Sequence, residues 1–176
     1  MKHAKLGASN AHRWLVCTAS PAYEANFPEE QSPYAEEGTL AHDIVSQLLE
    51  GKKVKGNKGI VQNLLPYINY VNNLSGYRSI EVKLDYAEYV PNGFGTADCI
   101  VQDNETLTVI DLKYGQGVMV SAENNPQLKL YALGALLMHK EIKNVRMVIV
   151  QPRLDHISET EITAKELLQW AESIRT

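Results

Sequence analysis

The sequence has no apolar run long enough to cross a membrane, because none of its apolar stretches approaches the ~20 residues that a spanning helix needs. The N-terminal stretch MKHAKLGASNAHRWLVC also lacks the apolar core of a secretion signal, and its pattern is that of an opening helix. These two absences exclude a membrane-spanning protein. They predict a cytoplasmic protein with no membrane partner.

Cysteine and positive charge are also scarce. Cys17 and Cys99 are the only two cysteines and form no CxxC pair, which excludes a disulfide framework and a zinc knuckle, so we expect two reduced and largely buried thiols. The formal charge of -4 argues against a chain that coats nucleic acid nonspecifically, because such coating relies on many Lys and Arg side chains. A metal site remains compatible with this charge, since metal ligands are themselves negative. The lysine-rich stretch 52–58 fits a solvated loop.

The first half of the chain, residues 1–76, is predicted to be mainly helical. Ser9 can cap a helix to about Ala19, and Ser32 with Pro33 at the first position can begin a longer helix that ends at Gly51. A third helix is predicted from about 59 to 74 by apolar residues at helical spacing. The expected inward faces are Trp14 and Cys17 in the first helix, Ala41, Ile44, Val45 and Leu48 in the second, and Val61, Leu64, Leu65, Ile68 and Val71 in the third.

After Gly76 the pattern changes from helical to alternating, which predicts strands at 79–86, 95–102 and 106–114. The turn residues at 91–93 and at 103–104 suggest a meander of antiparallel neighbours. A helix at 126–139, a buried strand at 145–152 and a helix at 164–174 follow. We therefore expect one α/β (α+β) domain over 1–176, with a mixed central sheet of about four to five strands flanked by helices. Residues 77–153 would form the central sheet and helix, and 154–176 a C-terminal strand and helix.

The most informative residues are Asp98 on one predicted strand and Asp111 and Lys113 on the next. Alternation places Asp111 and Lys113 on one face, and a meander would put Asp98 across from them. Two converging carboxylates are what a hard cation such as Mg²⁺ or Mn²⁺ requires. The cation would bridge a scissile phosphate and a water, and Lys113 would orient that water or hold the phosphate.

A D-x-K triplet on a strand is more often an exposed ion pair than a catalytic site. Here, however, the strand VIDLK is apolar with charges at its end, so the acids would be buried at cost unless they had a partner. This setting favours the functional interpretation.

Weaker signals lie nearby on three other elements. Gly93 and Gly95 precede Asp98 and allow a bulge or a close ligand approach, or simply form a turn. On the long predicted helix, Gly38 and His42 share a face, so His42 is a candidate third ligand, although a lone helical histidine is usually a core or surface residue. Glu37 beside Gly38 could add a water-mediated contact. Gln127 and Tyr131 share one face of the helix at 126–139 and can each donate a hydrogen bond to phosphate or bound water, or else belong to ordinary packing.

Taken in order, Gly38-xxx-His42, Gly95-xx-Asp98, Asp111-Leu-Lys113 and Gln127-xxx-Tyr131 resemble the motifs of RecB-like PD-(D/E)xK nucleases. The similarity covers roughly residues 9–153. The segments ASNAHRWLVCTAS, YAEEGTLAH and IDLKYGQGV also resemble a phage and prophage family of exonucleases that was long described only as a domain of unknown function.

The resemblance implies a restriction-endonuclease-like core and a role for each motif residue. His42, Asp98, Asp111 and the Leu112 carbonyl would hold Mg²⁺ or Mn²⁺, as one or two ions, and Lys113 would be catalytic with Asp98 and Asp111. Gln127 and Tyr131 would support the DNA phosphate. Asp111 stands where Glu is more common, which shortens this ligand by a methylene. No iron-sulfur cluster is expected, because Cys17 lacks the three late cysteines that some RecB-like relatives have.

The leading hypothesis is therefore a metal-dependent deoxyribonuclease, an exonuclease encoded by a phage or prophage and acting in recombination or DNA processing. By family analogy its partners would be DNA, a single-strand annealing protein and further copies of itself, as in the ring-shaped trimer of the distantly similar lambda exonuclease. An alternative is a catalytically silent nuclease fold that binds DNA or a partner. A third, an unrelated metal hydrolase, would need a histidine-rich or extra carboxylate cluster that the sequence does not show.

Overall fold

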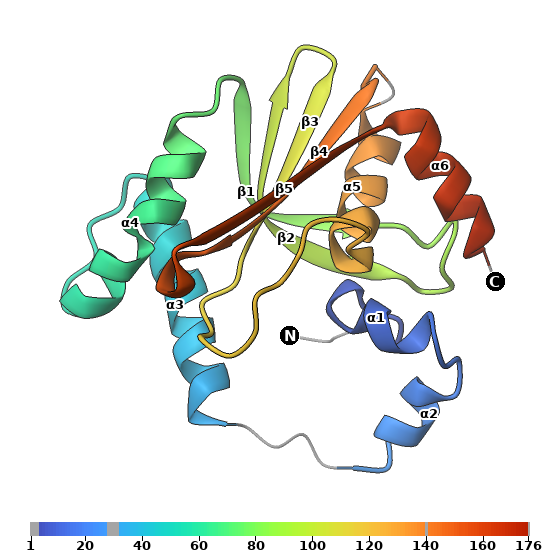
Figure 1. The fold of residues 1–176 in the computed structure, drawn as a ribbon, viewed down its shortest axis with the longest axis horizontal. Coiled ribbons are helices and arrows are strands. Elements are labelled where there is room, and N and C mark those ends of the chain that lie inside the picture. Colours follow the sequence, from blue (N-terminus) through green and yellow to red (C-terminus); the bar gives the residue numbers. More distant parts are fainter. Residues whose placement is uncertain (1–3, 28–31, 140, 176) are drawn as a thin grey trace.

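A five-stranded sheet forms the centre of the computed structural model, which describes residues 4–27, 32–139 and 141–175 (Figure 1). The strands lie in the order β1-β2-β3-β4-β5. Their bounds are β1 Tyr77–Asp85, β2 Phe94–Asp103, β3 Thr106–Leu112, β4 Asn144–Gln151 and β5 His156–Thr163. The three predicted strands and the predicted buried strand are all present.

The sheet is mixed, as predicted. β1, β2 and β3 form an antiparallel meander, whereas β3 and β4 are parallel and are connected through helix α5 (Pro126–Met138). β5 returns antiparallel to β4. Because β3 and β4 are parallel, both end at the same end of the sheet, which we call the site end. The end at which they begin is called the far end.

Helices cover both faces of the sheet. α3 (Pro33–Leu49) and α4 (Lys58–Asn72) pack on one face, while α5 and α6 (Ala164–Ser173) pack on the other (Figure 1). The core against α3 and α4 is made of Ala41, Ile44, Val45, Leu64, Tyr67, Val71, Cys99, Val101, Ile110, Leu112, Tyr114, Val148 and Val150. Burial of these side chains on both faces is the main source of stability.

Helix α3, which carries part of the site, begins as the sequence predicts. The Ser32 side chain accepts a hydrogen bond from the Ala35 N–H, and Pro33 occupies the first turn, where no backbone N–H is needed. The predicted inward residues Ala41, Ile44 and Val45 are buried and Leu48 is half-buried. α4 agrees less well, because Leu65 is 37% exposed while Tyr67 is buried.

The N-terminal helix differs from its prediction. Instead of one helix from Ser9 to Ala19, the chain forms a 3-10 turn, the short helix α1 (Ala11–Trp14) and a further helix α2 (Ser20–Glu24). Ser9 caps neither of the first two. The buried Trp14 donates its indole N–H to the Gly7 carbonyl at 3.0 Å, so tertiary packing against α5 decides this segment. Cys17 lies beyond α1 and is exposed, so the expectation that it is buried is wrong, while Cys99 is buried.

The C-terminal part holds the strand and helix expected within 154–176. β5 alternates between exposed and half-buried residues, as an edge strand with one covered face does. α6 begins with a capping box in which Thr163 and Glu166 satisfy each other's backbone N–H groups. None of the helices in the described part of the chain is long and apolar enough to cross a membrane.

Candidate metal centre

The candidate site lies at the site end, where β2 and β3 separate. The two strands pair from Asp103↔Thr106 to Cys99↔Ile110, and Asp98 and Asp111 are the next residues in this register. Beyond that point β2 continues to pair with β1, and β3 continues to pair with β4. The Asp98 Oδ2 atom accepts a hydrogen bond of 2.7 Å from the Leu112 N–H. A side chain thus occupies the position where the backbone ladder ends.

A local distortion of β1 and β2 accompanies this opening. Glu81 lies opposite Asp98 in the hairpin register and has a left-handed backbone, with φ of 52°. On either side of it, Ile80 packs toward α3 and α4, whereas Val82 packs toward α5. In a regular strand, residues two apart share a face, so the strand changes faces at Glu81. Left-handed backbone in a non-glycine residue costs on the order of 1 kcal/mol and is concentrated at functional sites.

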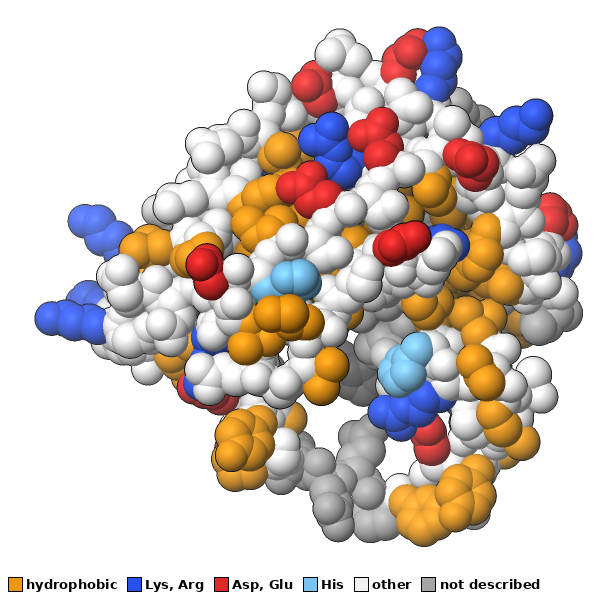
Figure 2. Space-filling model, in the orientation of Figure 1, with side chains coloured by type: hydrophobic (Ala, Val, Ile, Leu, Met, Phe, Trp, Pro, Cys, Tyr) orange, Lys and Arg blue, Asp and Glu red, His pale blue; other side chains and the backbone are white. Residues whose placement is uncertain are grey.

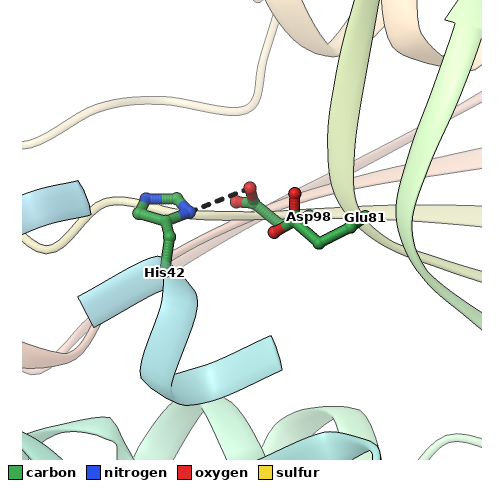
Figure 3. Close-up of side chains that lie close together, drawn as sticks. All are labelled: His42, Glu81 and Asp98. Atoms are coloured by element: carbon green, nitrogen blue, oxygen red, sulfur yellow. Dashed lines mark hydrogen bonds and ion pairs between the residues drawn. The ribbon is translucent and has the colours of Figure 1, made fainter. Parts of the chain in front are cut away.

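His42, Glu81 and Asp98 form one group of candidate ligands, and Figure 3 shows the histidine of α3 pointing toward the two carboxylates of the sheet. One ligand atom from each residue lies within 4.8 Å of the others. His42 Nδ1 is 2.9 Å from Asp98 Oδ1. Asp98 is nearly buried, with a side chain 13% exposed, and that of His42 is 33% exposed. These three groups can hold a divalent cation through oxygen and imidazole nitrogen.

Asp111, Lys113, Gln127 and Tyr131 form a second group beside the first. The Gln127 amide donates from Nε2 to Asp111 Oδ1 at 2.9 Å, and its Oε1 accepts from Lys113 Nζ at 2.8 Å. This amide orientation is the one that suits an ionised carboxylate, which only accepts, and an ammonium, which only donates. Gln127 Nε2 also lies 3.3 Å from the Tyr131 hydroxyl oxygen. α5 therefore fixes the acid and the base of the D-x-K motif relative to each other.

One oxygen in this group is left without a hydrogen bond. Asp111 is 3% exposed, and its Oδ2 has no hydrogen-bond partner among the described residues. Lys113 Nζ lies 2.9 Å from this oxygen, close enough for an ion pair but outside hydrogen-bonding geometry. The Lys113 ammonium thus neutralises part of the charge on this oxygen, but burial of the Asp111 carboxylate is only partly offset by this one partner. The residues present therefore fit a bound cation.

The charges of the two groups influence one another. Burial raises the pKa of Asp111 to about 6, because Lys113 only partly offsets the loss of water and the Asp98 charge adds to the rise. Burial alone would lower the pKa of His42, but the Asp98 carboxylate and its hydrogen bond, together with Asp111, raise it above its ordinary value. Burial and the Asp98 charge also raise the pKa of Glu81. The net effect of burial and the neighbouring carboxylates thus favours the protonated forms of all three groups.

The structure brings the predicted site residues together in two clusters linked through Asp98 and Leu112. His42 and Asp98 lie in the first cluster, and the second contains Asp111, Lys113, Gln127 and Tyr131. Asp111 is not part of the mutual group formed by His42 and Asp98. Glu81 does belong to the group of His42 and Asp98, although the sequence analysis did not identify it as a candidate ligand.

Two glycines of the sequence motifs have different structural roles. A Cβ atom on Gly95 would lie 2.8 Å from Tyr131 Cε1, so this glycine lets the Tyr131 ring pack against β2. A Cβ atom on Gly38 would meet nothing within 4 Å. The fold therefore requires Gly95 and leaves open space over Gly38, on the α3 face that carries His42.

The loop after Lys113 is fixed by a residue that sequence reasoning missed. Gln151, only 2% exposed, accepts from the Val120 N–H at 2.6 Å and donates to the Val118 carbonyl at 3.0 Å. His156 Nε2 lies 3.2 Å from the Val120 carbonyl. A buried polar residue at the end of an apolar strand is the signal that could have marked Gln151.

Similar solved structures include a crystal structure from Eubacterium rectale named "Putative exonuclease". It aligns with a TM-score of 0.51 at 12% sequence identity, over 96% of this chain and 77% of that chain. At this identity the likeness shows a shared fold. The crystal structure of SSO0001 aligns over 94% of this chain and 89% of that chain at 15% identity, with a TM-score of 0.30.

The sequence also matches a family profile along nearly its whole length. The matched residues are 3–75 and 58–176, and the family is described as "Protein of unknown function (DUF2800)". Both the helical half and the sheet half are thus part of the family pattern. The chain belongs to the DUF2800 family.

Proposed function

We propose that this chain is a nuclease of the RecB-like PD-(D/E)xK type, which hydrolyses DNA phosphodiester bonds with a divalent cation. The observation that carries the proposal is the buried Asp111 carboxylate, whose Oδ2 forms an ion pair with Lys113 but no hydrogen bond, and whose ionised form is disfavoured by burial and by the charge of Asp98. Keeping an ionised carboxylate out of water costs several kcal/mol. An arrangement of this kind is stable when a cation occupies it and is typical of functional sites.

His42, Asp98, Asp111 and the Leu112 carbonyl would hold Mg²⁺ or Mn²⁺, and Glu81 is placed to add a further oxygen. When bound, the cation supplies charge neutralisation at the scissile phosphate and makes a bound water more acidic. The imidazole of His42 favours Mn²⁺ somewhat over Mg²⁺, because nitrogen ligands suit the softer ion.

Lys113 would act on the substrate directly. Its side chain is 30% exposed, and its ammonium donates a hydrogen bond to Gln127 and forms an ion pair with Asp111, so a further N–H can point to a phosphate oxygen or an attacking water. A fixed donor aimed at developing negative charge is effective because it needs no rearrangement during the reaction. Gln127 and Tyr131 keep Lys113 and Asp111 in position.

The surface around this site is not strongly basic. On the one face of the molecule that Figure 2 draws, Lys and Arg side chains are scattered and interspersed with Asp and Glu. With a formal charge of -4, the chain gains little from nonspecific phosphate attraction. DNA binding would depend on the cation and on a few well-placed donors.

A digestion assay tests the proposal. Linear and covalently closed circular DNA are incubated with the protein and Mg²⁺ or Mn²⁺, next to an EDTA control and the Lys113→Ala variant. We expect metal-dependent degradation that Lys113→Ala slows by about 10²- to 10³-fold. Loss of linear DNA alone would identify an exonuclease and support the finer proposal of a phage or prophage enzyme for recombination or DNA processing beside an annealing protein.

Absence of cutting with both metals would contradict the proposal. It would favour the alternative of a nuclease fold that binds DNA or a partner without catalysis. A gel-shift measurement on the same DNA then separates the two cases, because a shift identifies DNA as the partner and no shift favours a partner other than DNA.

A further inference from the structure

Arg153 has an unusual environment just beyond the site end of β4. It lies in the 3-10 turn Pro152–Leu154, and its guanidinium is centred 4.9 Å from the ring of the buried Tyr114. The Tyr114 hydroxyl accepts a hydrogen bond from Asn63 of α4 at 3.2 Å, which fixes the ring. Arg153 Nη1 donates to Glu37 Oε2 at 2.7 Å. The side chain therefore lies over an aromatic ring and is hydrogen-bonded to a carboxylate, and it is 19% exposed.

Most hydrogen-bonding capacity of this guanidinium is unused. A guanidinium has five N–H donors in a planar fork, and the contact with Glu37 is the hydrogen bond made by the Arg153 side chain within the described residues. Its Nε is buried and has no hydrogen-bond partner there. Leaving a buried charged donor unpaired costs free energy, because its hydration is lost without replacement. The donors of Arg153 that make no hydrogen bond could serve an anion that reaches the guanidinium.

The position of Arg153 relates it to the candidate metal centre. Val150, three residues earlier, accepts a backbone hydrogen bond from the Lys113 N–H at 2.9 Å, and Tyr114 directly follows Lys113. Glu37 precedes His42 by five residues on α3, a rise of about 7.5 Å along the helix axis. Arg153 thus lies at the same end of the sheet as the scissile position, displaced beyond it along α3.

We infer that Arg153, stacked on Tyr114, binds a backbone phosphate of the DNA next to the scissile phosphate, and that Glu37 holds the guanidinium in place until the phosphate replaces it. This inference rests on the proposed nuclease function. Arginine is suited to the role because its fork binds two phosphate oxygens at once, which lysine cannot do.

The first test is the salt dependence of DNA binding. It is measured with a labelled linear oligonucleotide and Mg²⁺ in the Lys113→Ala background, where the DNA remains intact. Each lost phosphate contact reduces the slope of log affinity against log salt by about 0.7 to 0.9. We expect this reduction for Arg153→Gln. The matched control is Arg146→Gln, since Arg146 lies at the far end of the same strand and pairs with Glu161, and we expect no change in its slope.

The second test locates the phosphate. Single linkages of the oligonucleotide are replaced in turn by uncharged methylphosphonates. We expect that at one linkage beside the cleaved bond the replacement lowers the DNA affinity of the protein that retains Arg153. The same replacement should leave the DNA affinity of Arg153→Gln unchanged. A merely structural role for Arg153 would not produce this position-specific loss of sensitivity.

The outcomes separate the two proposals. If the wild-type protein neither cuts nor binds DNA, the proposed function fails. If it cuts DNA while Arg153→Gln keeps the wild-type salt slope and sensitivity at every linkage, this inference fails alone. If Arg153→Gln does not fold, Glu37→Gln decides, because removing the competing carboxylate should tighten DNA binding, and unchanged or weaker binding would overturn the inference.

Discussion

The two ends of the central sheet carry similar charged residues in opposite environments. At the far end, Arg146 of β4 pairs with Glu161 of β5 at 3.3 Å, and both side chains are about half exposed, at 40% and 47%. At the site end, Lys113 pairs with Asp111 at 2.9 Å, and the Asp111 side chain is 4% exposed. Both pairs are close ion pairs, and they differ most in the burial of the acid.

This difference separates an exposed ion pair from a buried one. An exposed pair contributes ~0–1 kcal/mol, since water and salt screen it. A buried pair loses more in desolvation than it regains from its own attraction unless further partners complete it. The site end therefore carries buried charge that its own ion pair does not fully offset, and the proposed cation would offset the rest.

The largest difference between variants of the two ends is expected in the rate of DNA cleavage. Lys113→Ala should reduce the rate of DNA cleavage by about 10²- to 10³-fold, because it removes a fixed donor to the developing charge. Arg146→Gln should leave the rate within twofold, as it acts on an exposed pair at the other end. Single-turnover cleavage of linear DNA measures both. Equal losses in the two variants would remove the distinction between the ends.

Stability should change in the direction opposite to activity when Asp111 is neutralised. The folded chain raises the pKa of Asp111 to about 6 from its ordinary value near ~4. The folded state thus binds this proton more tightly than the unfolded state, so without metal the free energy of unfolding falls as the pH rises through this interval. The raised pKa of His42 acts in the same direction at higher pH.

Asp111→Asn should therefore be more stable than the wild type at pH 7 in EDTA, by about 2 kcal/mol. Lys113 retains its hydrogen bond to Gln127 in this variant. Thermal unfolding from pH 4 to 8 should show a gap that opens as the pH rises, with Tm higher by roughly 4–8 °C at pH 7. Equal or lower stability of the variant at pH 7 would show that the buried carboxylate carries no strain.

The sequence predicted which residues gather at the site end better than it predicted how they are arranged. Period-two alternation placed Asp111 and Lys113 together, and the turn residues gave the antiparallel hairpins, so these features follow from local pattern. Glu81 could not be found in this way, because its role depends on the register with Asp98 and on a left-handed backbone inside a strand. Arg153 was not identified from the sequence for a similar reason, since its partners Glu37 and Tyr114 are distant in sequence.

The N-terminal segment shows where helix prediction from sequence spacing fails. Spacing predicted one helix from Ser9 to Ala19, yet the burial of Trp14 and its bond to Gly7 divide the segment. Helix propensity over so few residues is weak compared with burial of one indole ring. The four-turn helices α3 and α4, with long apolar faces, were predicted at nearly correct positions.

A moderate effect is expected at Glu81, the ligand candidate that the sequence missed. Glu81→Gln should weaken Mn²⁺ binding by about tenfold, comparable to the loss of a supporting group at a metal site. Cleavage should recover when Mn²⁺ is raised in proportion, whereas Lys113→Ala should not recover. A variant with unchanged metal dependence would place Glu81 outside the centre.

A smaller effect is expected at Gly38, which the fold itself does not require. A Cβ atom there meets nothing within 4 Å, and glycine within a helix costs roughly 0.5–1 kcal/mol relative to alanine. Gly38→Ala should therefore raise Tm by ~1–4 °C. DNA affinity should fall if the substrate approaches α3 at this point. A more stable variant with unchanged DNA affinity would assign Gly38 no part in binding.

The smallest effect is expected at the far end. Glu161→Gln should change the free energy of unfolding by less than ~0.5 kcal/mol, with no dependence on divalent metal. Chemical denaturation with and without Mn²⁺ measures this. A large or metal-dependent change would show that the two ends are less different than their burial indicates.

Calorimetric titration of Mn²⁺ into the metal-free protein tests the central claim most directly, namely that the excess buried charge at the site end is a cation site. Wild type, Asp98→Asn, Asp111→Asn and the far-end control Glu161→Gln are compared at pH 7. We predict saturable binding in the wild type and the control, and at least a tenfold loss of affinity in both aspartate variants. Equal Mn²⁺ affinity in all four proteins, or no binding by the wild type, would contradict the account.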